Sequence, residues 1–282
     1  MLPSAPAHAS SQPAFPIRAA FYYPWFPEAW KQGGRFPFTR YSPTLGFYDL
    51  RRTGVVQAHV RAMTYGHIDA AISSWWGRGH RTDRRLAGLL STTAAMRSPL
   101  RWSIYYERES HSDPQPAEIS RDLRYIRGRY GRRPAFLRIH GRFAVFVYAE
   151  GSDGCGMARR WRRANRHVRA YLVLKVFPGY RGCRSRPQSW HQYAPAAPSD
   201  SQGRFSYAIS PGFHKSGESS PRLPRDLGRW RRNVRAMAAS KARFQLVTTF
   251  NEWGEGTAVE SAAQWGSASS YGEYLDALHA NP

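Results

Sequence analysis

The sequence has little of what would place it in several common protein classes. Its 282 residues include only two cysteines, Cys155 and Cys183, so it is not a disulfide-rich scaffold. Their spacing lacks the pattern of a zinc site, and the ten histidines are scattered singly. We therefore expect no metal and no cofactor. No apolar run is long enough to span a membrane.

Acidic residues and lysines are also scarce. Nineteen acidic residues face 42 basic ones, which gives a net charge of +23, and a field of that size attracts polyanions. Arginine dominates because the only lysines are Lys31, Lys175, Lys215 and Lys241. Coding bias explains so uneven a ratio of arginine to lysine. The functional alternative is non-specific attraction to anionic cell-envelope polymers. The basic residues are spread along predicted outer helices without a recognisable nucleic-acid motif, so we expect no specific nucleic-acid binding.

The first sixteen residues differ in composition from the rest. They are rich in proline, alanine and serine, and Ala7-His8-Ala9 resembles the end of a signal peptide, although a hydrophobic segment is missing. We predict a disordered leader or signal-peptide remnant over residues 1–16, a single domain over residues 17–282, and secretion of a monomer. The length suits either one large α/β barrel or two smaller domains, and no linker divides the remainder.

Apolar runs alternate with amphipathic stretches along this domain. Helices are predicted from about Leu50 to Tyr65 and from about Asp226 to Ser240, and a short hairpin over residues 134–142. Strand, helix, strand repetition indicates parallel pairing with helical crossovers. Seven strands are predicted, with an eighth around residues 189–193 where no clean pattern exists: residues 18–23, 70–75, 101–106, 143–148, 170–177, 205–209 and 244–250.

The run from Leu246 to Thr257 carries the strongest functional signal. A buried, β-branched strand ends at two carboxylates, Glu252 and Glu255, and Gly254 and Gly256 allow a sharp turn there. Two carboxylates held together repel, so one keeps its proton near neutral pH while the other is ionised. Glycoside hydrolysis needs such an acid and base pair. The alternative is a surface turn whose glutamates are simply solvated. The position of the pair at the end of a buried strand argues against it.

The same residues resemble a known family. Asn251-Glu252-Trp253-Gly254-Glu255-Gly256-Thr257 is similar to the Asn-Glu-Trp-His-Glu-Gly-Thr signature of glycoside hydrolase family 99, the endo-α-mannosidase and endo-α-mannanase group of (β/α)8 barrels. The resemblance runs from about Ala19 to Ala262 through further segments in the same order: residues 21–25, 41–49, 68–77, 105–107 and 143–148.

The resemblance implies an α/β fold, a single-domain (β/α)8 TIM barrel, and a retaining, endo-acting α-glycoside hydrolase of polysaccharide or oligosaccharide. It assigns Glu252 as the base that acts on the sugar's 2-hydroxyl, through a 1,2-anhydro intermediate, and Glu255 as the acid. Gly254 stands where the family has histidine, which predicts a lost hydroxyl contact and a wider pocket. The alternatives are an endo-1,3-α-glucanase-like hydrolase and a non-catalytic glycan- or polyanion-binding barrel.

Active sites of such barrels lie at the carboxyl ends of the strands. Aromatic rings there would stack on sugar faces, although core packing is the alternative for about half of such a set. For Glu107, an ion pair with an arginine is the alternative to a substrate contact. The predicted substrate-binding residues are Tyr22, Tyr23, Trp25, Trp75, Trp76, Tyr106, Glu107, Asn251 and Trp253.

The two cysteines follow neighbouring predicted strands. Cys155 comes after the fourth strand and Cys183 after the fifth. Adjacent parallel strands bring both residues to the same end of the sheet, so a disulfide between them is geometrically plausible. Two unpaired, buried thiols are the alternative.

Overall fold

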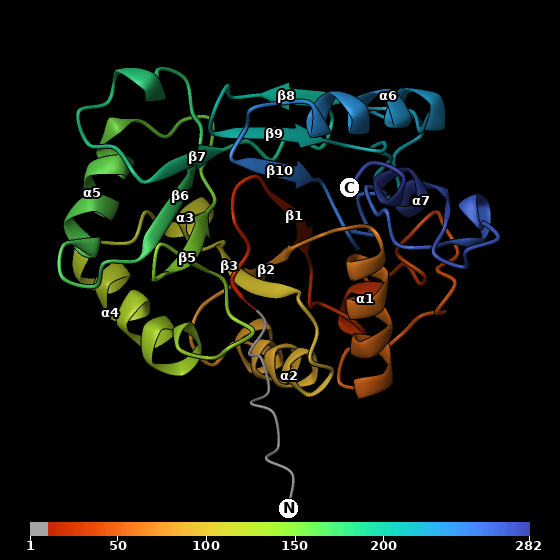
Figure 1. Cartoon of the computed structure of the whole chain (residues 1–282), viewed down its shortest axis with the longest axis horizontal. Coiled ribbons are helices and arrows are strands. Elements are labelled where there is room, and N and C mark those ends of the chain that lie inside the picture. The colour runs from red at the N-terminus through yellow and green to blue at the C-terminus, as the bar shows by residue number, and fades with distance from the viewer. Residues whose placement is uncertain (1–10) are drawn as a thin grey trace, which may run out of the picture.

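The computed structural model describes residues 11–282, which contain eight parallel strands. The strands curl around a common axis, and helices lie outside them (Figure 1). This is the (β/α)8 barrel. The parallel strands are β1 (Ile17–Tyr22), β2 (Ala70–Trp75), β3 (Arg101–Tyr106), β5 (Arg142–Val147), β6 (Tyr171–Lys175), β7 (Ser189–His191), β9 (Ser206–Ile209) and β10 (Phe244–Val247).

The sheet runs in the order β7, β6, β5, β3, β2, β1, β10, β9 and β8. Strand β8 (Ser199–Ser201) pairs antiparallel with β9, so β9 has β10 on one edge and β8 on the other. Within the described residues, therefore, no ladder joins β7 to β9. Strand β4 (Arg138–Ile139) forms the predicted short hairpin with β5, and it turns at His140 and Gly141.

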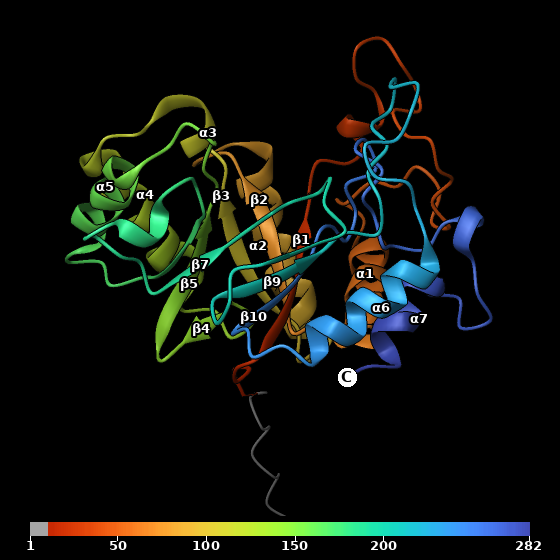
Figure 2. The ribbon, with the colours of Figure 1, turned by 90° about the horizontal axis from the view of Figure 1, so that it is seen from above.

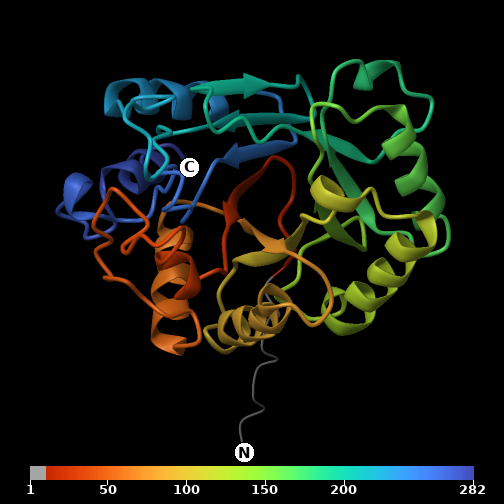
Figure 3. The ribbon, with the colours of Figure 1, turned by 180° about the vertical axis from the view of Figure 1, so that it is seen from behind.

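Helices cover the outside of the sheet, as the reverse view also shows (Figure 3). Strand-to-strand crossovers contain α1 (Thr53–Tyr65), α2 (Arg81–Ala95), α3 (Glu109–Ser112), α4 (Pro116–Ile126), α5 (Cys155–Asn165) and α6 (Leu227–Ala238), and α7 (Glu273–His279) ends the fold. Short turns of helix add η1 (Glu28–Trp30), η2 (Arg127–Gly131), η3 (Tyr180–Gly182) and η4 (Ala263–Trp265).

The sequence explains where the two predicted helices begin and end. Helix α1 starts three residues after the predicted Leu50, buries Val56, Val60 and Met63 on one side, and stops at Gly66. In α6, the side chain of Asp226 accepts a hydrogen bond from the Arg229 N–H and so caps the first turn. Burying each large apolar side chain contributes about 1.5–3 kcal/mol, so packing decides which face turns inward.

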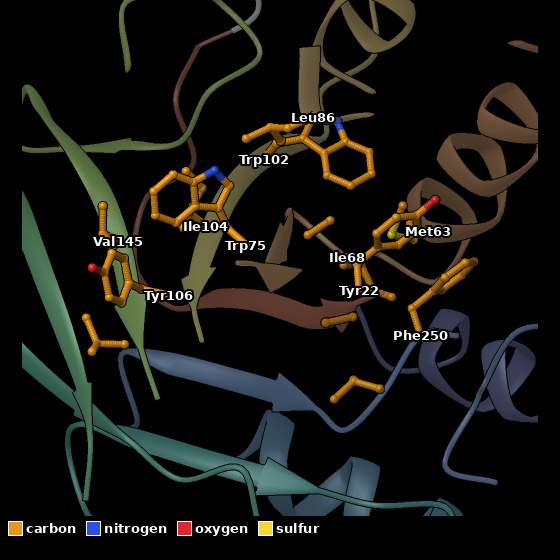
Figure 4. Close-up of a cluster of buried hydrophobic side chains, with 14 of the residues drawn as sticks. Tyr22, Met63, Ile68, Trp75, Leu86, Trp102, Ile104, Tyr106, Val145 and Phe250 are labelled. Atoms are coloured by element: carbon orange, nitrogen blue, oxygen red, sulfur yellow. The ribbon is translucent and has the colours of Figure 1, made fainter. Parts of the chain in front are cut away.

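Alternation along the strands creates two separate hydrophobic cores. One fills the barrel and includes Phe21, Ile72 and Phe146. The other lies between the sheet and the helices, and Figure 4 shows part of it around Trp102 and Met63. Successive residues of a strand point to opposite faces, so each strand contributes to both cores.

Two boundaries differ from the sequence-based prediction. Strand β10 ends at Val247, not Phe250, because Thr248 and the residues after it turn into the loop that carries the glutamates. Residues 1–10 of the predicted leader lie outside the described residues, but the part from Ser11 to Pro16 is packed against the barrel. Gln12 bonds with the backbone of Phe136 and Arg138.

A disulfide joins Cys155, the first residue of α5, to Cys183, directly after η3, with the two Cα atoms 5.3 Å apart. It ties together the segments that follow β5 and β6. In the part of the chain that the structure describes, no helix combines the length and the apolar character needed to cross a membrane.

Candidate active site

The loop after β10 is fixed by its own hydroxyl groups. The Thr249 N–H donates to the Thr257 carbonyl, and the two threonine hydroxyls lie 2.9 Å apart. The Glu252 N–H donates to the Thr249 hydroxyl at 2.9 Å. Gly256 has a φ of +67° and sits so close to the His214 carbonyl that a Cβ would lie 2.7 Å from its oxygen. These contacts hold Glu252 and Glu255 at the carboxyl end of the barrel.

Asn251 and Trp253 support this loop from behind. The Asn251 side chain bonds with both the N–H and the carbonyl of Tyr23, at 2.7 and 3.1 Å. The Trp253 indole N–H lies 3.0 Å from the Tyr48 hydroxyl and 3.1 Å from a Glu260 carboxylate oxygen. Both predicted side chains are fully buried and neither lines the pocket, so they position the loop and do not wall the site.

A cavity of about 240 Å³ opens at this end of the barrel. Loops after β1 and β9 rise above it side by side (Figure 2), and Ser216 and His214 bond to the backbone of Gly254 and Glu255. Five predicted residues meet here: Tyr23, Trp25, Glu107, Glu252 and Glu255. Six lining residues were missed by the sequence reasoning or predicted in another role: Gln32, Phe38, Tyr148, Tyr193, Lys215 and Gly254.

The cavity is lined by two buried carboxyl groups, Glu107 and Glu252, and by the partly buried Glu255. Burial, followed by the charge of Glu255, raises the pKa of Glu252 to about 8. Burial also raises the pKa of Glu255, against the Tyr193 hydroxyl and the positive charges of Lys215 and Arg222, which lower it. For Glu107, burial raises the pKa to about 8. Each of these carboxyl groups therefore holds its proton more strongly than a free glutamate does, and the ionisation of Glu252 is opposed by the charge of Glu255.

Two buried carboxylate oxygens of cavity-lining residues have no hydrogen-bond partner among residues 11–282. They are Oε2 of Glu252 and Oε1 of Glu107. The arginine ion pair considered for Glu107 does not form, since its polar neighbour is the Ser74 hydroxyl. Unpaired buried acceptors of this kind are costly unless a ligand satisfies them. Sugar hydroxyls would do so.

A chain of hydroxyls leads to the second glutamate. The Tyr23 hydroxyl donates to that of Tyr193 at 2.8 Å, and the Tyr193 hydroxyl donates to Oε2 of Glu255 at 3.4 Å. Tyr193 follows the short β7, in the region where the sequence shows no clean pattern, so no sequence signal identified it.

Three predicted aromatic residues lie elsewhere, and their assignment to sugar binding is wrong. Tyr22, Trp75 and Tyr106 point into the core between sheet and helices (Figure 4). Their polar atoms bond to His59, Asp83 and Asp122 respectively. The residues that follow Tyr22 and Tyr106, namely Tyr23 and Glu107, line the cavity because neighbouring strand residues face opposite ways.

Trp76 lines an adjoining hollow of about 510 Å³. Trp25 and Gln32 line both this hollow and the cavity that holds the glutamates. The second hollow therefore continues the first along the surface of the barrel.

The space beside Gly254 is already filled. A Cβ there would lie 2.9 Å from the Phe38 ring and 3.0 Å from Oε1 of Glu252. The predicted widening of the pocket at this position is therefore wrong, because the Phe38 ring occupies the place that a side chain at Gly254 would take. Phe38 thereby adds an apolar surface next to Glu252.

One acidic group outside the cavity has the spacing of cation ligands, namely Glu109, Asp113 and Asp153. Arg160 pairs with two of its members, Glu109 and Asp113, and the Trp161 indole donates to Glu109. The guanidinium thus takes the place that a cation would occupy.

Comparison with solved structures places this geometry in context. The GH99 endo-α-mannosidase of Bacteroides thetaiotaomicron superposes with a TM-score of 0.71 at 17% identity, over 95% of this chain and 97% of that one. A glycoside hydrolase-like protein gives a TM-score of 0.66 at 14% identity, over 98% and 96%. No curated protein matches the sequence.

A sequence comparison adds the family. The model of glycosyl hydrolase family 99 matches residues 37–162. This match covers a little under half of the chain, so the chain is similar to the family over that segment. The match includes Phe38 and Glu107 of the cavity, whereas Glu252 and Glu255 follow it in the chain. The structure thus adds what the family model does not cover, since it places the two glutamates in the same cavity as Glu107.

Proposed function

We propose that this chain is a retaining, endo-acting α-glycoside hydrolase of a polysaccharide. The observation that carries the proposal is that Glu252 and Glu255 line one cavity at the carboxyl end of the barrel and both have raised pKa values. The pKa of about 8 at Glu252 makes its ionisation depend on the proton of its neighbour. A pair that shares one proton near neutral pH can divide acid and base work.

In the first step, Glu252 takes the proton of the sugar's 2-hydroxyl. The freed oxygen attacks the anomeric carbon as its bond to the leaving oxygen breaks, and Glu255 gives its proton to that leaving oxygen. The products of the step are a 1,2-anhydro sugar and the released chain end. The partnerless Oε2 of Glu252 is free to accept the hydroxyl proton.

In the second step, the roles reverse. Glu255 takes a proton from water as the water oxygen attacks the anomeric carbon and opens the anhydro ring, while Glu252 returns its proton to the 2-oxygen. Two inversions give net retention. The Tyr193 hydroxyl, which bonds to Glu255, stabilises its ionised form between the steps.

The surface around the pair supports an extended substrate. Trp25 lies between the catalytic cavity and the hollow lined by Trp76, so neighbouring sugars of one chain can contact both indoles. A surface that contacts several consecutive sugars suits cleavage within a chain, so we expect endo action. A panel of α-mannans and α-glucans identifies the sugar, and it includes mannan because of the endo-α-mannosidase likeness.

We also propose that the protein works outside the cytoplasm as a monomer. The disulfide between Cys155 and Cys183 supports an oxidising compartment.

The experiment replaces each glutamate by glutamine, which keeps the side-chain shape but removes acid and base function. Turnover of Glu252→Gln and of Glu255→Gln should fall by at least ~10²-fold, the lower end of what a positioned acid or base supplies. The control is Glu150→Gln, an exposed glutamate after β5 on the same end of the barrel, which should keep wild-type turnover.

A folded Glu252→Gln or Glu255→Gln protein that hydrolyses a verified substrate at the wild-type rate contradicts the assignment. Glycan binding without any hydrolysis by the wild-type protein would instead favour a non-catalytic barrel.

A further inference from the structure

The surface at the amino ends of β5, β6 and β7 carries two adjoining hollows. The first, of about 480 Å³, lies between α5 and β6, and the second, of about 590 Å³, lies at the β4–β5 turn. Both are lined by Arg142 and Arg169, so they form one continuous depression, here called the arginine groove. Its eight arginines are Arg127, Arg132, Arg138, Arg142, Arg162, Arg166, Arg169 and Arg186.

The charge of the groove is not neutralised. No aspartate or glutamate lines either hollow, and none of the eight arginines forms an ion pair among residues 11–282. Elsewhere on the molecule, Arg85, Arg108 and Arg222 each pair with a carboxylate. An arginine-rich composition alone accounts for scattered arginines, but not for eight like charges in one hollow. Their mutual repulsion is relieved when anions bind.

The side chains indicate the kind of ligand. A guanidinium group is a planar fork that binds carboxylate or phosphate through two parallel hydrogen bonds. A groove with many such forks suits a chain that carries an anionic group at regular intervals. Two rings that line the hollows, Trp161 and Phe143, are buried, and His140 is the one exposed ring in the lining of the described groove. Successive nucleic-acid bases therefore have no series of exposed rings on which to stack.

We propose that the arginine groove is a second glycan site, which binds an anionic polysaccharide at the end of the barrel opposite the catalytic cavity. Arg142 begins β5 and Arg169 precedes β6, whereas the three cavity glutamates all follow the carboxyl ends of strands. A bound chain therefore leaves the catalytic cavity open. The groove keeps the enzyme on an anionic matrix while the cavity acts on its substrate.

The test measures binding of polygalacturonate to the whole protein, with neutral dextran as the uncharged probe. The groove variant carries Arg142→Gln, Arg162→Gln, Arg166→Gln and Arg169→Gln. The control variant carries Arg61→Gln, Arg231→Gln, Arg232→Gln and Arg235→Gln, four exposed arginines of α1 and α6 that lie outside the groove. Both variants lose four positive charges, so bulk charge is matched.

The groove variant should bind polygalacturonate at least about tenfold more weakly than the wild type, and the control variant within about threefold, at equal ionic strength. Binding of the uncharged dextran should be the same for the wild type and for both variants. The double variant Arg142→Gln/Arg169→Gln changes only the two arginines that line both hollows, and its binding should weaken less. It replaces the fourfold variant in the test if that variant unfolds. Equal loss in groove and control variants overturns the proposal.

Tighter, groove-dependent binding of single-stranded DNA than of polygalacturonate overturns it in favour of a nucleic-acid site. Because the readout is binding and not hydrolysis, the result does not depend on the roles of Glu252 and Glu255.

Discussion

At the scale of single residues, Glu107 links the stability of the protein to pH. Burial raises its pKa from an ordinary 4.5 to about 8. Below pH 4.5 the carboxyl group is neutral in the folded and the unfolded chain, so it adds no cost. As pH rises from 4.5 to 8, the unfolded chain releases the proton while the folded chain keeps it, and stability falls. Above pH 8 the full cost is present.

Glu107→Gln fixes the neutral form at every pH. We expect the variant to exceed the wild type in free energy of unfolding by about 1–4 kcal/mol at pH 8 and to differ little from it at pH 4.5. Urea unfolding at the two pH values measures this, with Glu150→Gln as the exposed control. A difference of the same size at both pH values would mean that packing, not proton binding, is responsible.

Trp25 and Trp75 separate the two roles that aromatic residues play here. Trp75 is fully buried between sheet and helices, so Trp75→Ala should lower the free energy of unfolding by about 3–5 kcal/mol. Trp25 lines the catalytic cavity and is only partly buried. Trp25→Ala should raise KM roughly threefold to tenfold and cost far less stability. Thermal unfolding and steady-state kinetics on both variants check this, and a large loss of stability in Trp25→Ala would contradict it.

The sequence could locate the strand ends but not the direction of each side chain. Tyr22 and Tyr23 are adjacent and similar, yet one packs against His59 in the outer core and the other lines the cavity. Period-two alternation forbids both from facing the same way. Applying it to Tyr106 and Glu107 would have separated those two as well. Phe38 and Lys215 could not be found, because their loops have no regular pattern.

At the scale of elements, the predicted strands match because parallel strands buried on both faces are continuous apolar runs. The exception is β7, only three residues long, for which the sequence gives a region and no pattern. The end of β10 was predicted too late because Thr248, Thr249 and Phe250 are good strand formers. Thr249 bonds instead to Thr257 within the loop, and the Thr248 hydroxyl donates to the Tyr193 carbonyl.

The disulfide fixes α5 to the segment after β6. It closes a loop with a sequence separation of 28 residues, so replacing both cysteines by serine should lower the free energy of unfolding by about 3–4 kcal/mol on the chain-entropy model. Denaturant unfolding of the double variant measures the loss. Intact mass before and after reduction and alkylation shows the bond directly, and two thiols that alkylate without reductant would refute it.

At the scale of the whole molecule, the charge of +23 and the catalytic cavity should respond differently to salt. Counterion release drives binding of DNA to a basic surface, so that binding should be weak, indifferent to sequence and lost steeply as salt rises. Binding of neutral oligosaccharide should change little with salt, because stacking and neutral hydrogen bonds are hardly screened. Titration of Glu255→Gln with both ligands at low and high salt tests this. Tight DNA binding that survives high salt, without affinity for any glycan, would contradict the proposal that the protein is a glycoside hydrolase.

The interrupted barrel also determines where the fold opens first. Since β9 uses both edges for β10 and β8, no backbone ladder joins β7 to β9 among residues 11–282. A side-chain bond from the Thr248 hydroxyl, after β10, to the Tyr193 carbonyl, after β7, crosses this boundary. Backbone amides at this boundary should exchange with solvent before those of β1 or β2. Tyr193 and Glu255 lie on opposite sides of it. A sugar that contacts both residues would bridge the boundary. Substrate binding would therefore stabilise the part of the barrel that no backbone ladder joins.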